Sequence, residues 1–233
     1  MDRQDNIDVD LSASLSEAWR ILTTTEREIL RANASIQYYK RNDKIYCEGE
    51  APKDLMCLLY GKVKISKRGV GGRSQIVRII KPIHQFAYRA YFARETYLTD
   101  ATAFEASKIC TIPMTVVESL IQANSKLALY FIRQLSVDLG IADTRTVNLT
   151  QKHIRGRLAD SLLFLRDCYG LEEDEATLNI YFSRQELANL SNMSISNAIR
   201  TLTTFVSEHI IAINGRKIKI LDEERLRKVS RIG

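Results

Sequence analysis

The sequence predicts an α+β fold in which a small antiparallel β-roll precedes a long helix and a C-terminal winged helix-turn-helix. Three observations support this fold class. Short runs of alternating apolar and polar residues, separated by turn residues, occupy about 38–112, which is typical of a roll or barrel. Helical periodicity returns after Pro113 and continues to about residue 147. Two short helical segments and a hairpin pattern then follow within 182–221.

Length and composition are those of a globular protein with a basic surface. The chain has 233 residues, of which 45% are hydrophobic and 27% charged, enough for one large or two ordinary domains. Its formal net charge of +6 favours a polyanionic partner. The first ten residues contain no apolar signal segment, and no stretch reaches membrane-spanning length. We therefore expect a cytoplasmic protein without a membrane partner.

The cysteines are well separated along the chain and form no metal-binding motif: Cys47, Cys57, Cys110 and Cys168. Without a C-x-x-C or Cys/His cluster, zinc and simple iron–sulfur sites find no support. Ser/His/Asp and paired-carboxylate patterns are missing as well. The glycines at 69, 71 and 72 occupy a hairpin turn, not the strand-to-helix junction of a phosphate loop. We expect no enzymatic activity and no resident cofactor.

The first domain is expected to cover residues 1–123. Its first 36 or so residues are polar and then helical, and Thr25 and Glu28 have the spacing of a capping box. Short strands follow from Tyr38, interrupted by turn residues around Gly49, Pro52 and Gly61. Further strands are expected over 76–80 and within 101–112.

A long helix and a hinge are expected over residues 124–149. Apolar side chains recur there at alternating spacings of four and three, the pattern of a heptad seam: Ala128, Ile132, Leu135, Leu139 and Ala142. We favour a parallel homodimer through this seam. The alternative is a helix buried on two faces within a single chain. The stretch 148–150 is interpreted as the hinge, and the next helix should run from Gln151 to about Cys168 and stop at Gly170.

Residues 182–205 predict a helix-turn-helix within a C-terminal domain over 150–233. Ser183 and Glu186 have capping-box spacing, Asn192 suits a left-handed turn position, and Ser194 can cap a second helix. One face of that helix is apolar: Ala198, Ile199, Leu202 and Phe205. The opposite face carries the residues expected to read the major groove: Ile195, Ser196, Asn197 and Arg200. The alternative is an ordinary helical hairpin in a core.

A two-stranded hairpin follows the second helix directly and is interpreted as a wing. The pair Asn214–Gly215 predicts a type I′ turn. Arg216, Lys217 and Lys219 lie near this turn and suit DNA phosphates. Asp222 is expected to cap a final basic helix. The acidic run 172–175 is expected to be a solvated loop.

In this order, the parts resemble the cyclic-AMP receptor and fumarate–nitrate regulator (Crp/Fnr) family of bacterial transcription factors. The resemblance covers about 38–221 and rests on short segments in sequence order: 48–50, 58–63, 156–159, 183–188 and 194–200. It implies a cyclic-nucleotide-binding-like β-roll (a double-stranded β-helix), homodimeric binding of double-stranded DNA, and RNA polymerase as a further partner. On this basis Ser183 and Arg184 join Ser194 among the expected DNA contacts.

The effector pocket departs from the family pattern. The family holds the ribose of cyclic AMP with a Glu, and the matching position here is Tyr88. The family's phosphate-binding Arg followed by Ser or Thr is replaced by Leu98–Thr99 or a near neighbour, and its base-contacting Thr-Ser by Ala142–Asp143. A buried phosphate without a charge-assisted partner is costly. We therefore expect an unidentified effector other than cyclic AMP. The expected pocket residues are Tyr88, Arg89, Tyr91, Leu98, Thr99, Ala142 and Asp143.

Two alternatives remain open at this level. One branch of the family binds haem through His or Cys, and His84, Cys47 and Cys57 are the residues available for such a role. A haem- or redox-dependent gas sensor is therefore the first alternative, although isolated His and Cys residues are more often packing residues. The second is a sensor or interaction module that no longer reads DNA, because Arg200 is the one basic residue on the reading helix. Ile195–Ser196 replaces the family's Arg-Glu, so the operator sequence should differ.

Overall fold

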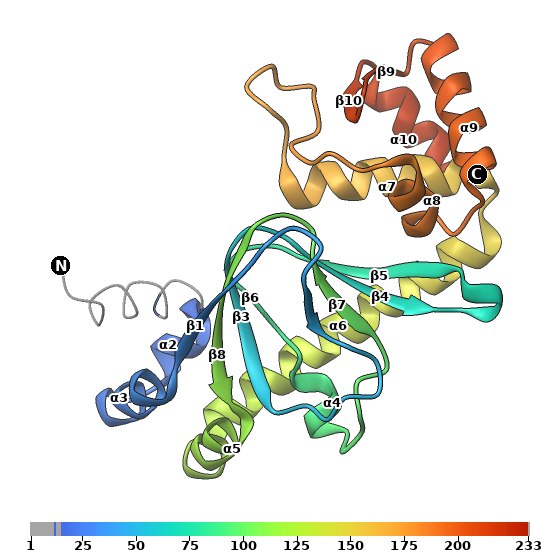
Figure 1. The fold of residues 1–233 in the computed structure, drawn as a ribbon. Coiled ribbons are helices and arrows are strands. Elements are labelled where there is room, and N and C mark those ends of the chain that lie inside the picture. The colour runs from blue at the N-terminus through green and yellow to red at the C-terminus, as the bar shows by residue number, and fades with distance from the viewer. Residues whose placement is uncertain (1–11, 13–14, 233) are drawn as a thin grey trace. The chain divides into compact units, whose positions relative to one another are not determined.

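A computed structural model of the chain describes residue 12 and residues 15–232. The first ten residues, where the sequence lacks an apolar signal segment, lie outside this range. The chain divides into two compact units (Figure 1). The roll unit comprises the described residues up to 68 together with 77–139. The second unit comprises 69–76 and the described residues from 140 onward, and it is called the DNA-binding unit after the helix-turn-helix predicted in it. Among the described residues, no helix is both long and apolar enough to cross a membrane.

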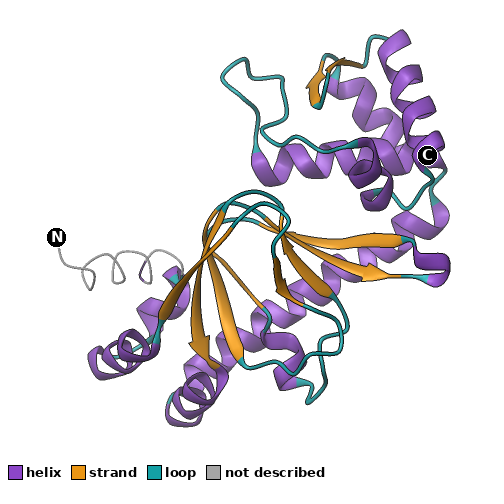
Figure 2. Ribbon diagram, viewed as in Figure 1, coloured by secondary structure: helices purple, strands orange, loops and turns teal. Residues whose placement is uncertain are grey.

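The predicted roll is present as two four-stranded sheets, drawn as orange arrows in Figure 2. One sheet has the order β1-β8-β3-β6 and the other the order β2-β7-β4-β5. Neighbouring strands with a defined register run antiparallel. The strands are β1 (Ser35–Tyr39), β2 (Lys44–Tyr46), β3 (Asp54–Tyr60), β4 (Val63–Arg68), β5 (Ser74–Ile80), β6 (His84–Phe86), β7 (Asp100–Ala103) and β8 (Ser107–Pro113). Strand β6 and the short helix α4 (Tyr88–Phe92) were not predicted.

Two apolar clusters form the core of the roll unit, because strand β3 is buried on both faces. The interior cluster joins the two sheets and includes Leu58, Val63, Phe86 and Ile109. The outer cluster lies on the other face of the β1-β8-β3-β6 sheet and packs against helices, with Cys57 and Cys110 fully buried in it. Alternation along β3 and β8 sends successive side chains to these two clusters in turn.

Helices α2 (Ser16–Ile21), α3 (Thr24–Asn33) and α5 (Met114–Ala123) contribute to the outer cluster. The capping box of α3 is formed by Thr23 and Glu26, so the predicted Thr25–Glu28 pair was wrong. Both pairs have the required spacing, but the Glu26 carboxylate also accepts a hydrogen bond from Asn124 Nδ2 at 3.1 Å. Trp19 is half-buried, and the Arg27 guanidinium lies 5.5 Å from the centre of its ring.

Helix α6 (Ser125–Gln151) is continuous through the predicted hinge at 148–150. The next helix, α7, covers Ile154–Tyr169, so the break between them lies at residues 152–153 rather than at 148–150, and α7 begins three residues after the predicted Gln151. The threonine hydroxyls at and just before the expected hinge do not end the helix, because Thr150 and Thr146 each bond back to a carbonyl four residues earlier. Gly170 ends α7 with a φ of 72°, as predicted.

Gly61, the glycine of the segment 58–63, forms the turn between β3 and β4. Its φ is +90°, and a Cβ built on it would lie 2.4 Å from the Ala106 carbonyl oxygen. Gly49 has a similar φ of +91°, but a Cβ there would meet no atom within 4 Å. Substitutions at the two glycines therefore allow the effect of backbone strain to be separated from the effect of steric overlap.

Gly61→Ala is expected to lower the free energy of unfolding of the roll unit by about 1–3 kcal/mol from backbone strain alone, with the steric overlap added to it. Gly49→Ala carries the strain without the overlap and is the matched control. Urea denaturation followed by circular dichroism gives both values. Equal losses for the two variants would show that the contact with Ala106 relaxes without cost.

The DNA-binding unit has three further helices and the hairpin. They are α8 (Arg184–Leu190), α9 (Ile195–Ser207), β9 (Ile211–Asn214), β10 (Lys217–Ile220) and α10 (Glu223–Ile232). Its core gathers fully buried side chains from α7, α8, α9 and the hairpin, among them Leu158, Leu187, Phe205 and Ile218. Asp222 caps α10, as predicted, by accepting a hydrogen bond from the Arg225 amide at 2.8 Å.

Candidate nucleic-acid interface and effector region

Helices α8 and α9 form the predicted helix-turn-helix, and local hydrogen bonds define both helix starts. Ser183 and Glu186 make a reciprocal capping box at α8. Ser194 caps α9 by accepting a hydrogen bond from the Asn197 amide at 3.2 Å. Asn192 takes the expected left-handed conformation in the turn, with a φ of 51°. These short-range contacts place the start of α9 directly after a tight turn.

The helix-turn-helix is attached to the rest of its unit by polar contacts near both ends of α9. The Ser191 hydroxyl in the turn donates to the Ser161 hydroxyl of α7 at 2.8 Å, and Ser191 is fully buried. At the other end of α9, Arg155 forms an ion pair with Glu208 and lies 5.1 Å from the ring centre of Phe205. This bidentate pair raises the pKa of Arg155 and lowers that of Glu208. Both ends of α9 are thus fixed.

The exposed face of α9 is more apolar than predicted. Ala198, Leu202 and Phe205 are buried as expected. Ile199 was assigned to the buried face, but its side chain is 47% exposed and lies one turn after the exposed Ile195. The helical spacing of 3.6 residues places Ile199 at the margin of the apolar stripe, where packing against α7 and α8 decides the outcome. Ile199 is therefore an addition to the candidate reading face.

Arg200 and Asn197 are hydrogen-bonded to each other on this face. Arg200 Nη2 donates to Asn197 Oδ1 at 2.7 Å across one helical turn. Because Asn is neutral, the guanidinium charge stays uncompensated by this contact. Ser196, also exposed, is the neighbour of Asn197 on the N-terminal side. The four predicted reading residues thus lie within the first two turns of α9.

The wing turn differs from the prediction by one position. Asn214 pairs with Lys217, so the two central residues are Gly215 and Arg216 rather than Asn214 and Gly215. Gly215 has a φ of 59°, but the φ of Arg216 is not positive. A type I′ turn needs a left-handed conformation at both central residues, so the predicted turn type was wrong. Arg184 Nη2 donates to the Gly215 carbonyl at 3.1 Å, which ties the start of α8 to the wing.

The acidic run 172–175 is not simply solvated. Glu172 forms an ion pair with Lys217 at 3.0 Å, and Asp174 forms one with Lys219 at 3.1 Å. Lys219 joins Lys217 as a wing residue whose charge is compensated. Arg216, at the tip, is exposed. The candidate phosphate contacts of the wing therefore fall into two groups: Lys217 and Lys219 are paired with carboxylates, whereas Arg216 is exposed at the tip.

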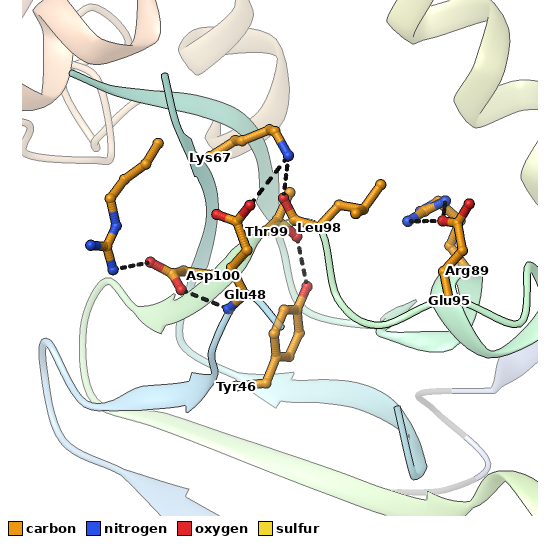
Figure 3. A network of polar contacts seen from close by, with 9 residues as sticks. Tyr46, Glu48, Lys67, Arg89, Glu95, Leu98, Thr99 and Asp100 are labelled. Carbon is orange, nitrogen blue, oxygen red and sulfur yellow. Dashed lines mark hydrogen bonds and ion pairs between the residues drawn. The ribbon is translucent and has the colours of Figure 1, made fainter. Parts of the chain in front are cut away.

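Stacked tyrosines fill part of the roll interior. The rings of Tyr46 and Tyr97 stack with centroids 3.8 Å apart, and both belong to the interior cluster. Burial raises the pKa of both hydroxyls. The Tyr46 hydroxyl lies 3.4 Å from Thr99 Oγ1, within the network drawn in Figure 3. Thr99, one of the predicted pocket residues, is thus in contact with this aromatic pair.

The two predicted pocket tyrosines, Tyr88 and Tyr91, belong to or pack against the outer cluster. Tyr88 is buried there, with its ring centre 5.3 Å from that of Phe131 on α6. Burial raises its pKa, so it is a neutral phenol near neutral pH. Tyr91 packs at the margin of the same cluster and donates a hydrogen bond to Glu118 at 2.6 Å. The structure therefore separates Tyr88 and Tyr91 from Tyr97.

Charged residues around the roll are paired with each other (Figure 3). Arg89 lies 3.3 Å from Glu95, and Lys67 donates to the Leu98 carbonyl at 2.9 Å. Asp100 accepts from the Glu48 amide and from Lys44. Burial opposes ionisation of Asp100, but these two donors outweigh it and lower its pKa. Ala142 and Asp143 are exposed on the part of α6 that belongs to the DNA-binding unit.

The residues considered for haem ligation lie in different parts of the roll unit. Cys57 is fully buried in the outer cluster, whereas His84 pairs across the β3–β6 ladder with Leu58 of the interior cluster. Cross-strand partners share a sheet face, so Cys57 and His84 are on opposite faces. Cys47 is half-buried in the loop after β2. Among the described residues, no group of three or more His, Cys, Asp or Glu could hold a metal ion.

One face of α6 carries exposed apolar side chains. Within the predicted seam, Ile132 is 58% and Leu139 63% exposed. Leu135 is half-buried and packs against the outer cluster of the roll unit. The exposed stripe is thus centred on Ile132 and Leu139, with Leu135 at its margin.

A double-sheet roll, a long helix and a winged helix-turn-helix define a class of transcription regulators that combine a sensing domain with a DNA-binding domain. Comparison with known families agrees with this class. Residues 36–124 match the cyclic nucleotide-binding domain and residues 156–229 the Crp-like helix-turn-helix domain. The chain belongs to the Crp/Fnr family of transcription regulators.

Individual relatives span most of the chain. It is 25% identical over 194 residues to the CRP-like cAMP-activated global transcriptional regulator of Mycobacterium tuberculosis, covering 83% of this chain and 87% of that protein. It is 22% identical over 189 residues to the anaerobic regulatory protein of Bacillus subtilis, covering 80% and 79%. In fold, it resembles FixK2 from Bradyrhizobium japonicum, with a TM-score of 0.76 at 19% identity over 84% of this chain and 96% of that one.

Proposed function

We propose that the protein is a homodimer that binds a specific operator through the exposed face of α9. The observation that carries the proposal is the start of α9, where a capped helix N-terminus presents Ile195, Ser196, Asn197 and Arg200 together. Recognition helices contact base edges with such N-terminal residues. Arg200 suits guanine O6 and N7, Asn197 suits adenine, and the isoleucine side chains suit the thymine methyl group.

The flanking polar residues are proposed as phosphate contacts that position α9. Ser183 and Arg184 lie at the start of α8, Ser194 at the start of α9, and Arg216 and Lys217 on the wing. Backbone amides at helix starts and basic side chains are the usual partners of DNA phosphates. RNA polymerase is proposed as a further partner by family resemblance alone.

Selection of bound fragments from the organism's own genome tests the proposal. We expect a two-fold symmetric sequence, because a C2 dimer presents two copies of α9 to two half-sites. A gel-shift titration at several salt concentrations then separates specific from non-specific binding. If no fragment is enriched and no salt-dependent shift occurs, the protein is instead an interaction module that does not read DNA.

The dimer is proposed to form through the exposed stripe of α6. Ile132 and Leu139 recur seven residues apart, as a helix pair with heptad packing requires. Such exposed leucines and isoleucines on one long helix favour a second copy of the same helix as their partner.

We propose further that the effector is not cyclic AMP. Tyr88 at the ribose-binding position is buried in the outer cluster, and Arg89 is paired with Glu95. A cyclic phosphate would need a cationic partner in the roll interior, where Tyr46 and Tyr97 stack.

Calorimetric titration of the protein, at micromolar concentration, with cyclic AMP up to a 100-fold excess is expected to give no binding heat. Cyclic AMP is also expected to cause no rise in operator affinity. A ligand-binding interaction at that excess would stabilise the protein measurably. Micromolar binding together with tighter DNA binding would contradict this prediction and would place a functional pocket among the residues in Figure 3.

A haem-dependent gas sensor is the less favoured alternative. Cys57 and His84 face opposite sides of one sheet, so they could not ligate the same iron. A Soret band in the visible spectrum of the purified protein would revive this alternative.

A further inference from the structure

We infer that the acidic turn at 172–175 restrains DNA binding by occupying the wing lysines in the free protein. The inference rests on the proposed function, because it concerns the same DNA-binding surface. Glu172 is 45 positions away from Lys217 in sequence, yet their side-chain oxygen and nitrogen lie 3.0 Å apart. Asp174 and Lys219 are 3.1 Å apart. Two carboxylates thus stand where two DNA phosphates would bind.

The acidic turn is held against the wing by backbone pairing, so the ion pairs are not chance contacts of a loose loop. The segment that follows the turn adds to the edge of β10: the Leu178 amide donates to the Ile218 carbonyl, and the Ile220 amide donates to the Ala176 carbonyl, each at 2.9 Å. Thr177 pairs with Lys219 in the same ladder. The carboxylates are therefore fixed next to the lysines on the neighbouring strand.

Hydrogen bonds within the turn orient the carboxylates. Asp174 accepts from the amides of Ala176 and Thr177 and from the Thr177 hydroxyl at 2.8–3.1 Å. These bonds, with Lys219, lower the pKa of Asp174. The Tyr181 hydroxyl and Lys217 likewise lower the pKa of Glu172. Both groups are ionised near neutral pH and carry full negative charge.

Lys217 is also held by the ring of Tyr181, whose centre lies 5.2 Å from the ammonium nitrogen. Exposed ion pairs are individually weak, so DNA phosphates can displace the carboxylates. The displaced carboxylates would then lie beside the DNA backbone and repel it. Because phosphate contacts are independent of sequence, the restraint acts on non-specific and specific DNA alike. Base contacts by α9 are left unchanged, and they therefore account for a larger share of the operator affinity.

The test compares two double variants of the full chain that remove the same net charge. Glu172→Gln with Asp174→Asn removes the two paired carboxylates. Glu173→Gln with Glu175→Gln removes their two exposed neighbours, for which the described residues provide no ion pair. Affinities for the operator and for random DNA are measured at 50 mM and 200 mM salt.

The first variant is expected to bind both DNAs more tightly than the native protein at low salt. Two further phosphate contacts steepen the salt dependence, so this advantage should shrink by up to about tenfold between 50 and 200 mM. The control variant is expected to show a clearly smaller change. If the double variant does not fold, the single variant Glu172→Gln replaces it in the test. This is the safer change, because the Glu172 carboxylate contacts only Tyr181 and Lys217 among the described residues.

A double-mutant cycle gives a second readout. Lys217→Gln should weaken DNA binding more in the Glu172→Gln background than in the native protein, since the lysine is then unmasked. Equal effects of the two charge-matched variants, or weaker binding by the first, would overturn the inference alone. Failure of the native protein to bind any DNA would overturn the proposed function, and the inference with it.

Discussion

Leu139→Glu is expected to convert the proposed homodimer to a monomer. Leu139 is 63% exposed in the single chain and lies at the centre of the exposed stripe on α6. Burial of one leucine contributes about 1.5–3 kcal/mol, and two-fold symmetry doubles the loss. The dimer dissociation constant should therefore rise by at least about two orders of magnitude. Sedimentation equilibrium measures this change, and operator binding should fall with it.

Val137→Glu is the matched control for Leu139→Glu. Val137 is 55% exposed on the same helix, but its position lies outside the heptad seam. The control should leave the dimer intact. Leu135 is less suitable for this test because it packs on the outer cluster, so its replacement would disturb the fold. An unchanged dimer with Leu139→Glu, or equal dissociation of both variants, would show that another surface joins the subunits.

Arg200→Ala is expected to have the largest effect on sequence specificity. Its guanidinium is exposed on α9 and is held by a neutral partner, Asn197, at 2.7 Å. A bidentate contact with guanine contributes about 1–3 kcal/mol in each half-site. The variant should therefore lose affinity for the operator and lose its preference at one base pair per half-site.

Arg216→Ala is the comparison variant for Arg200→Ala. Arg216 lies at the wing tip, where we expect a phosphate contact. Its loss should weaken all sequences alike and reduce the slope of log affinity against log salt by about one. Affinities for the operator and its single-base variants at two salt concentrations distinguish the two patterns. If Arg200→Ala weakens every variant equally, Arg200 contacts a phosphate and α9 reads DNA with another face.

Features set by neighbouring residues were predictable from the sequence. The cap at Ser183, the left-handed Asn192 and the cap at Ser194 all depend on contacts within three or four positions. The order of roll, long helix and helix-turn-helix followed from periodicity together with turn and capping residues. The hinge was misplaced because Thr150 bonds back within the helix, a choice that its side chain leaves open.

Features set by distant residues were not predictable. Lys217 meets Glu172 only because residues 176–178 pair with β10. Tyr46 meets Tyr97 only because the roll brings them together. Ile199 is exposed because α7 and α8 do not cover the margin of the apolar stripe. No local pattern in the sequence encodes any of these three outcomes.

The position of Trp19 gives the roll unit its own optical signal. It is the one tryptophan in the sequence, and it is half-buried in the roll unit beside Arg27. Its fluorescence therefore follows unfolding of the roll unit, whereas far-ultraviolet circular dichroism also follows helices α7 to α10. Coincident transitions by the two methods would indicate that the units unfold as one cooperative block. Separated transitions would give each unit its own stability.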